Sequence, residues 1–509
     1  MLGSALGLLL GVLACTSERA AAPRQVQGDL EFSLQEATYW GDAPANNRGV
    51  AIDSAGNVVM VGGSDSRTWP SSLPRLGAGG FTDASVAKFD RAGKPLWSVT
   101  LGGPGEDYAY VVDITANDEI VVGGRAGPGF PTTTGAFDTT FNGGVGSGPH
   151  GPTDGFVAKL APDGRLLFAT YIGGSKDDNV RAIEILRSGM IAVGGGNTRS
   201  PDLPTHAGVL PGPVLKPSLG GKKDAWVAVL HPDGSGLDFL TYFGPDNDDS
   251  RRGDETIRAL AEDQLGNLWI GGTTSGDDMQ PTPDAFQPDR RDSAGSASAF
   301  IAKLSHDGRR LVYFSWLGGN GFDEIETEGT ADAQGNFYVA GSTVSKDFPT
   351  TPGAAQRTLR GGGGSFNGDG FVARINHDGS LGFATLHGGS AHSPEALFGP
   401  AVDAQGNVYV TGRMASTDVT TTVGAFQPRH AGPPGVHDAV LAVFGAKGQL
   451  RYSTYFGGSR EDVGRHVAVG PKGRAVVIIG ETRSSDLPLE KPLETRPSGA
   501  FLALFRHAR

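Results

Sequence analysis

The stretch that decides the fold runs from Asp154 to Gly174 and reads DGFVAKLAPDGRLLFATYIGG. Two apolar runs rich in β-forming residues flank the turn Pro162-Asp163-Gly164. Glycine supplies the positive φ that a tight connection between two strands needs. The pattern therefore predicts a β-hairpin.

The end of this hairpin, an apolar or aromatic pair followed by glycine, recurs along the chain. Seven copies are present, and their first glycines are Gly41, Gly102, Gly173, Gly244, Gly318, Gly388 and Gly457. The successive steps are 61, 71, 71, 74, 70 and 69 residues. A nearly constant period of this length indicates a repeat architecture.

Each repeat contains four short strand patterns separated by turn residues. In the first repeat they cover residues 49–53, 58–63, 84–89 and 96–101. No stretch shows sustained helical periodicity. Four short antiparallel strands repeated seven times predict an all-β fold, a seven-bladed β-propeller of four-stranded antiparallel blades.

The two ends of the chain complement each other. The last repeat has only three strand patterns, at 463–469, 475–480 and 500–505, and the missing type occurs alone at Leu30–Trp40. We therefore expect the N-terminal strand to join the C-terminal blade. This pairing would close the ring and remove an exposed sheet edge.

Composition excludes several classes of function. The net charge of −12 argues against a basic face that binds nucleic acid or an anionic membrane surface. The single cysteine, Cys15, excludes an intramolecular disulfide and a cysteine metal cluster. The 80 glycines fall at periodic turn positions, so we interpret them as connections between strands.

The first residues have the pattern of an export signal. Leu2–Ala14 is an apolar run too short to span a bilayer. The sequence Val12-Leu13-Ala14-Cys15 resembles the cleavage and lipidation box of bacterial lipoproteins, which implies acylation of Cys15. Plain secretion is the alternative. We predict a signal over 1–15, a flexible tether over 16–29 and a single propeller domain over 30–509. The predicted location is the bacterial outer membrane, as a lipoprotein, or the extracellular space.

Three segments of one repeat carry a resemblance to a known family. Residues 311–319 (LVYFSWLGG), 332–343 (DAQGNFYVAGST) and 347–354 (DFPTTPGA) closely resemble the bacterial SBBP, or seven-bladed β-propeller, repeat. The resemblance covers nearly everything from Leu30 onward. It implies an extracytoplasmic propeller of a kind often found in cell-surface proteins. It implies no reaction, because the repeat family has no defining catalytic residues.

Acidic residues follow the glycine pair in five of the seven repeats. In a propeller these connections would surround the mouth of the central channel. One interpretation is a site for calcium or another hard cation, which prefers oxygen ligands. The other is that each carboxylate accepts backbone N–H groups and fixes its own loop. The candidate ligands are Asp107, Asp178, Asp249, Asp323 and Asp462.

A second set of connections is long, as between Ser342 and Asp369. These connections repeat the motifs Pro-Thr-Thr and Gly-Ala-Phe, seen at 131–133 and 135–137, and end in variable glycine-rich tips such as 432–435. Long loops in compact domains are usually functional or disordered. Variable tips on a rigid base are where we expect a partner to be recognised.

Residues that break the repeat are the weak candidates for catalysis. His387 replaces the usual apolar residue before the glycine pair, His392 lies where other repeats carry an acid, and Glu395 is close in sequence. They could form an acid–base or metal cluster. The alternative is neutral drift in a tolerant repeat. The chain has no nucleophile elbow, no His-Glu-x-x-His and no P-loop.

These observations predict a monomeric, non-enzymatic propeller that binds or scaffolds at the cell surface. Its partner would be a protein or a polysaccharide of the cell envelope, held on the loop-rich face. Nucleic acid is excluded, and a lipid anchor would be its only membrane contact. The alternative function is a metal-assisted lyase or hydrolase with its site at the channel mouth. A structural envelope component is a third interpretation.

Overall fold

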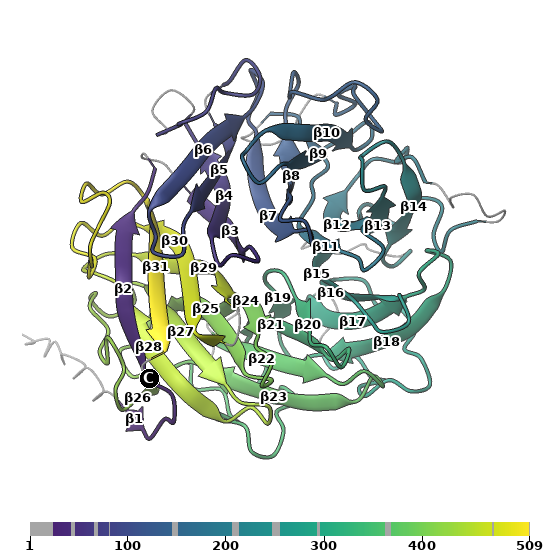
Figure 1. The fold of residues 1–509 in the computed structure, drawn as a ribbon. Coiled ribbons are helices and arrows are strands. Elements are labelled where there is room, and N and C mark those ends of the chain that lie inside the picture. Colours follow the sequence, from purple (N-terminus) through teal and green to yellow (C-terminus); the bar gives the residue numbers. More distant parts are fainter. Residues whose placement is uncertain are drawn as a thin grey trace, which may run out of the picture.

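The computed structural model describes residues 24–41, 46–65, 70–80, 82–144, 151–205, 213–246, 255–292, 296–361, 368–470 and 473–507. The named elements of these residues are all β-strands, and most of them form antiparallel sheets arranged around a centre (Figure 1). Within the described ranges no helix is long and apolar enough to cross a membrane. The all-β prediction is confirmed.

The first three sheets follow one another along the chain, and each adds its strands in sequence order. Sheet 1 contains β3 (Asn46–Ile52), β4 (Val58–Ser64), β5 (Asp83–Phe89) and β6 (Pro95–Leu101). Sheet 2 contains β7 (Tyr108–Ile114), β8 (Ile120–Ala126), β9 (Asp154–Leu160) and β10 (Leu166–Ile172). Sheet 3 contains β11 (Ala182–Ile185), β12 (Ile191–Thr198), β13 (Asp224–Leu230) and β14 (Leu237–Phe243). The predicted hairpin is the β9–β10 pair, in which Tyr171 lies opposite Phe156.

The next three sheets repeat this order. Sheet 4 contains β15 (Thr256–Glu262), β16 (Leu268–Thr274), β17 (Ser298–Leu304) and β18 (Leu311–Leu317), and one residue pair, Gly196 with Thr256, joins it to sheet 3. Sheet 5 contains β19 (Asp323–Ile325), β20 (Thr330–Ala331), β21 (Phe337–Thr343), β22 (Asp369–Ile375) and β23 (Leu381–His387). Sheet 6 contains β24 (Ala396–Val402), β25 (Val408–Met414), β27 (Asp438–Phe444) and β28 (Leu450–Phe456).

Sheet 7 combines the two ends of the chain. It contains β29 (Asp462–Val469), β30 (Ala475–Thr482), β31 (Ala500–His507) and, beside β31, the N-terminal strand β2 (Phe32–Tyr39). Strand β2 runs antiparallel to β31, with Ala37 opposite Ala503 and Tyr39 opposite Phe501. In Figure 1 the purple strand β2 lies next to the yellow strand β31.

Part of the segment expected to be a tether is ordered. Strand β1 (Gln25–Val26) pairs in parallel with β26 (Thr421–Thr422). The amide of Asp29 also donates to the carbonyl of Arg451, and its carboxylate pairs with the Arg451 guanidinium at 2.8 Å. Ordered structure therefore begins before residue 30, while residues 16–23 lie outside the described ranges.

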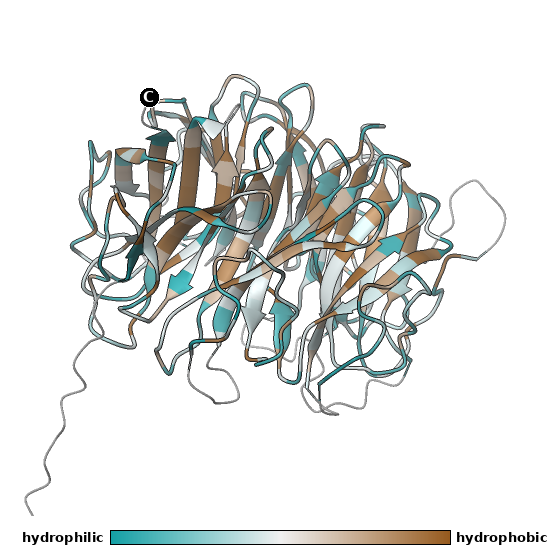
Figure 2. Ribbon diagram, turned by 90° about the horizontal axis from the view of Figure 1, so that it is seen from below, coloured by the Kyte–Doolittle hydropathy of each residue, from teal (hydrophilic) through white to brown (hydrophobic). Residues whose placement is uncertain are grey.

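The hydrophobic core lies between neighbouring sheets, because most strands are apolar on both faces. Separate apolar clusters join each sheet to the next, and one of them joins sheet 7 to sheet 1. Between sheets 4 and 5, Trp269 stacks on Phe337 with ring centroids 5.6 Å apart. Between sheets 7 and 1, Trp40 meets Phe89 edge-on at 4.7 Å. Hydrophobic residues follow the strands and hydrophilic residues gather in the connections (Figure 2).

The long second-to-third-strand connections fold back over the outermost strands. In sheet 2, Thr133 N–H donates to Ala169 and Tyr171 N–H donates to Asp138. In sheet 5, Thr351 N–H donates to Ala384 in the same way. Each motif thus covers the backbone of an edge strand, which would otherwise be open to pairing with other chains.

Candidate functional site

The acidic residues that were predicted as candidate cation ligands hold their own loops in place. Asp107, Asp178, Asp323 and Asp462 are fully buried. Each accepts a hydrogen bond from the backbone N–H of the second glycine of its own glycine pair, over distances of 2.7, 2.8, 2.9 and 2.7 Å. The glycine is required by close approach, since a Cβ on Gly458 would lie 2.8 Å from the Cβ of Ser484. We call these carboxylates the anchor acids.

The anchor acids also tie each loop to the neighbouring connection. Asp178 accepts a second bond from Ser200 Oγ at 2.8 Å, and Asp323 accepts one from Ser345 Oγ at 2.8 Å. In sheet 6 this role belongs to Glu395, which accepts from Gly389 N–H at 2.7 Å and from Ser416 N–H at 2.8 Å. These hydrogen bonds are the ones expected if each acid fixes its own loop.

Among the described residues of sheet 4, the anchor acid is one that the sequence analysis did not single out. Asp249 lies outside the described residues, and the buried anchor here is Glu255, which accepts from Ser275 N–H at 2.9 Å. The second glycine of the pair is replaced by Pro245, which has no N–H to donate. A longer connection shifts the acid along the chain, so a constant spacing from the glycine could not find Glu255.

Burial dominates the electrostatics of the anchor acids. Desolvation raises the pKa of Asp107 and of Asp323 to about 7, although backbone N–H groups lower it in part. Among the described residues no group of three or more His, Cys, Asp or Glu side chains is placed to hold a metal ion. Calcium binding by these acids stays a prediction.

A second row of buried acids was not identified as a site from the sequence. Each is the first residue of a third strand and accepts N–H groups from the tip of its long connection. For example, Asp154 accepts from Asn142 N–H at 2.7 Å, and Asp438 accepts from Ala431 N–H at 2.7 Å. Desolvation raises the pKa of Asp438 to about 8. The sequence did contain a signal for this row of acids, because Asp154 is the first residue of the stretch that decides the fold. The row consists of Asp83, Asp154, Asp224, Asp369 and Asp438.

The three weak catalytic candidates have different surroundings. His387 is buried, its Nε2 lies 3.2 Å from Ser453 Oγ, and its ring meets Phe444 edge-on. Burial lowers the pKa of His387 to about 4, which makes it a neutral core residue at neutral pH. Glu395 is an anchor acid, and His392 is exposed. Cys15, the predicted lipidation site, lies outside the described residues.

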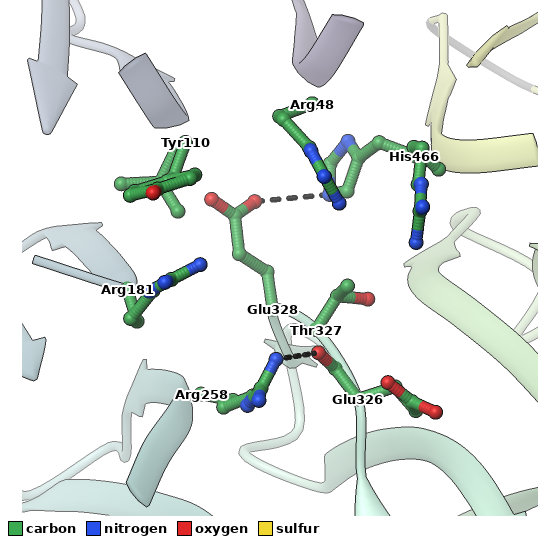
Figure 3. Close-up of a pocket in the computed structure, with 10 residues that line it drawn as sticks. Arg48, Tyr110, Arg181, Arg258, Glu326, Thr327, Glu328 and His466 are labelled. Atoms are coloured by element: carbon green, nitrogen blue, oxygen red, sulfur yellow. Dashed lines mark hydrogen bonds and ion pairs between the residues drawn. The ribbon is translucent and has the colours of Figure 1, made fainter. Parts of the chain in front are cut away.

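The polar site that sequence reasoning missed is the central channel. The innermost strands surround it, and in four of them the pairing register shifts at the same place. Such a bulge leaves one residue out of the ladder and redirects its side chain. The bulged residues are Arg48 in β3, Tyr110 in β7, Arg258 in β15 and Arg465 in β29. Arg181, directly before β11, joins them around a cavity of about 50 Å³ (Figure 3).

Salt bridges pair some of these arginines but not all. Arg48 and Arg465 share Glu481, at 3.2 and 2.8 Å. Arg258 lies 3.3 Å from Glu324. Arg181 instead donates to the amide oxygen of Asn179 at 3.1 Å, and its guanidinium carbon lies 3.7 Å from the centre of the Tyr110 ring. Burial, with repulsion from Arg258 and other arginines, lowers the pKa of Arg181 to about 10.

One carboxylate in the channel comes from sheet 5. The next turn aspartate comes eight positions after the anchor acid in sheets 4 and 6, whereas Asp332 comes nine positions after Asp323. The extra residue interrupts the innermost strand between β19 and β20. Figure 3 shows Glu328, from this interruption, pointing between Arg48, Tyr110 and Arg181. Its Oε2 lies 2.9 Å from His466 Nε2.

The sequence contains a pattern that marks the channel residues, but the pattern is visible only once the anchor acids are known. Three residues after Asp107, Asp178, Glu255 and Asp462 come Tyr110, Arg181, Arg258 and Arg465. The repeat alone does not show that these positions face one another. The channel residues are therefore recognisable from the sequence only after the anchor acids have been identified.

Comparisons with known proteins agree with a propeller-type repeat. Residues 252–274, which include β15 and β16, match the family described as "Two component regulator propeller". The regulatory protein FlaEY of Caulobacter vibrioides is 27% identical over 307 residues. That match covers 58% of this chain and 28% of FlaEY, so the chain spans less than a third of that relative.

Three solved structures align with most of this chain but share little sequence with it. The WD40 repeats of RRP9 align over 94% of this chain and 100% of theirs, with a TM-score of 0.47 and 9% identity. A protein of unknown function from Dyadobacter fermentans aligns over 94% of this chain and 100% of its own, with a TM-score of 0.41 and 11% identity. Hydrazine synthase of Kuenenia stuttgartiensis aligns over 89% and 94%, with a TM-score of 0.42 and 10% identity.

Proposed function

We propose that this chain is a closed, seven-bladed propeller of the SBBP type that binds a protein partner and catalyses no reaction. Pairing of β2 with β31 and packing of Trp40 on Phe89 support the closed ring. The match to a propeller repeat and the similarity to a regulatory protein support a binding role. Propeller folds commonly present their loops to other proteins.

The observation that carries the proposal is the difference between the two ends of the sheets. At one end the connections are tight turns, such as Asp53–Asn57, where the aspartate accepts from Asn57 N–H at 2.8 Å. At the other end lie the long connections, and both rows of buried acids hold them in place. A rigid base with variable tips suits recognition of a protein surface. The loop-rich end is therefore the proposed binding face.

Export and anchoring belong to the same proposal. Cys15 would carry the lipid, and the segment before β1 would act as the tether. A location at the cell envelope would bring the loop-rich face to a protein partner on the bacterial surface, with the propeller acting as a monomer. A chain whose only cysteine lies in a lipoprotein-type box supports this assignment.

Site-specific photo-cross-linking tests the binding face. A benzophenone amino acid replaces exposed Pro434, at the tip of the β25–β27 connection, or Leu265, in a tight turn at the opposite end, where its exposure is 82%. Both variants are expressed as the full chain in the native bacterium and irradiated. We expect a discrete protein adduct from position 434 and none from 265. Adducts from 265 alone, or equal adducts from both positions, would refute the proposed face.

A further inference from the structure

The central channel is locally cationic in an acidic protein. The chain carries a net charge of −12, yet Arg48, Arg181, Arg258 and Arg465 all line the same small cavity. Only two carboxylates, Glu326 and Glu328, belong to that lining. Low-dielectric walls strengthen the field of such a cluster and favour an anion inside it.

Several buried polar atoms of the channel lack a hydrogen-bond partner among the described residues. The Nε atoms of Arg48 and Arg258 make no hydrogen bond there, although other atoms of both guanidinium groups are paired. Among the described contacts, Arg181 has the Asn179 amide and the Tyr110 ring but no carboxylate. Buried polar atoms are nearly always satisfied in native proteins, so these donors indicate an additional acceptor.

The carboxylate of Glu328 offsets part of the positive charge of the channel arginines. Its Oε2 pairs with His466, while its buried Oε1 accepts no hydrogen bond from any residue that the structure describes. The side chain comes from the irregular residues between β19 and β20, and not from a regular strand. A carboxylate in this position has the chemistry of a ligand that the arginines could bind.

We propose that the channel binds one small oxyanion group, a phosphate or a carboxylate, beside Arg48, Arg181 and Arg258, and that Glu328 competes with it. Planar guanidinium groups bind both kinds of group through paired, charge-assisted hydrogen bonds. A cavity holds a water molecule when water-sized spheres can fill about 10–15 Å³ of it. By the same measure this cavity of about 50 Å³ has room for one small oxyanion group.

Calorimetric titration of the full chain tests the site. Inorganic phosphate and acetate are titrated separately at low ionic strength, because salt screens such contacts. We expect saturable binding of at least one anion. Arg181→Gln weakens binding about tenfold or more, because one set of charge-assisted bonds is lost. Glu328→Gln strengthens binding, because it removes the competing charge.

A matched control separates the channel from general charge effects. Arg165→Gln removes the same charge at an exposed turn and leaves binding unchanged. Circular dichroism establishes whether each variant folds. If Arg181→Gln does not fold, Arg258→Gln is titrated in its place. Saturation by phosphate alone or by acetate alone identifies the preferred group. The proposal is overturned if neither wild type nor Glu328→Gln binds either anion, or if the channel variant binds as wild type does.

Discussion

Glu328 Oε2 lies 2.9 Å from His466 Nε2 across the central channel, although the first residue belongs to sheet 5 and the second to β29 of sheet 7. His466 is also fixed from the other side, since its Nδ1 lies 3.1 Å from the carbonyl oxygen of Val50 in sheet 1. One imidazole thus connects three sheets. Glu328 comes from the irregular residues between β19 and β20, where sheet 5 has one extra residue before Asp332.

The anchor acid Asp323 should stabilise the fold without a metal ion. Asp323→Ala leaves Gly319 N–H and Ser345 Oγ–H without their acceptor, at a cost of about 1–3 kcal/mol for each buried donor. Thermal melts check this, with Asp163→Ala as the control, since Asp163 is exposed and accepts only from Arg165 N–H. If Asp323 only holds its loop, Asp323→Ala should lower the melting temperature by the same amount in the presence of calcium and in the presence of chelator. A loss confined to calcium would instead identify a cation site.

Removal of strand β2 should destabilise the entire protein. Deletion of residues 30–40 exposes the edge of β31 and removes Trp40 from the interface between sheets 7 and 1. We expect a lower melting temperature in one cooperative transition, followed by calorimetry. Deletion of residues 24–28 removes the two-residue strand β1 and should have a much smaller effect. An unchanged melting curve after the first deletion would contradict closure by β2.

The core between sheets 4 and 5 should depend on Trp269. This residue is fully buried, stacks on Phe337 and donates its Nε1–H to the Gly335 carbonyl at 3.1 Å. Trp269→Ala should lower the free energy of unfolding by about 3–5 kcal/mol, as measured by denaturant titration. Leu265→Ala, at a side chain that is 82% exposed, should stay within about 0.5 kcal/mol of wild type. Equal effects of the two changes would refute the described packing.

Stability should fall as pH rises from about 6 to about 8.5. Burial raises the pKa of Asp438 to about 8 and that of Glu395 to about 7, whereas unfolded carboxyl groups titrate near 4. Over this range the folded protein therefore holds more protons than the unfolded chain, so the free energy of unfolding decreases with pH. Melting temperatures across the range measure the slope. Asp438→Asn should make this slope shallower, and a rise in stability toward pH 8.5 would contradict the raised pKa values of Asp438 and Glu395.

Acylation of Cys15 should be the only lipid attachment. Cys15→Ser should abolish incorporation of labelled palmitate into the full chain in a bacterial host, because serine lacks the thiol that the lipid-transfer reaction needs. Ser17→Ala, two residues further along, should retain the label. Labelling that persists in the Cys15 variant, or is absent from wild type, would exclude a lipoprotein.

The strand pattern was accessible from sequence because it is local. Short apolar runs of β-forming residues and turns such as Pro162-Asp163-Gly164 depend on neighbours within a few residues, and the glycine period repeats these local signals. They predicted the hairpin β9–β10 and the four-stranded antiparallel sheets, which the structure confirms. The role of the Pro-Thr-Thr motif was not local, since Thr133 covers the distant residue Ala169.

The sequence by itself determined that the chain is a repeated set of short strands, because each strand and turn follows from its own residues. Only the tertiary structure decided which polar side chains meet. Arg48 and Arg465 share Glu481 because bulges direct them inward from sheets at opposite ends of the chain. Glu328 reaches His466 because one extra residue interrupts a strand. Such contacts depend on how sheets are placed around an axis, which no local pattern encodes.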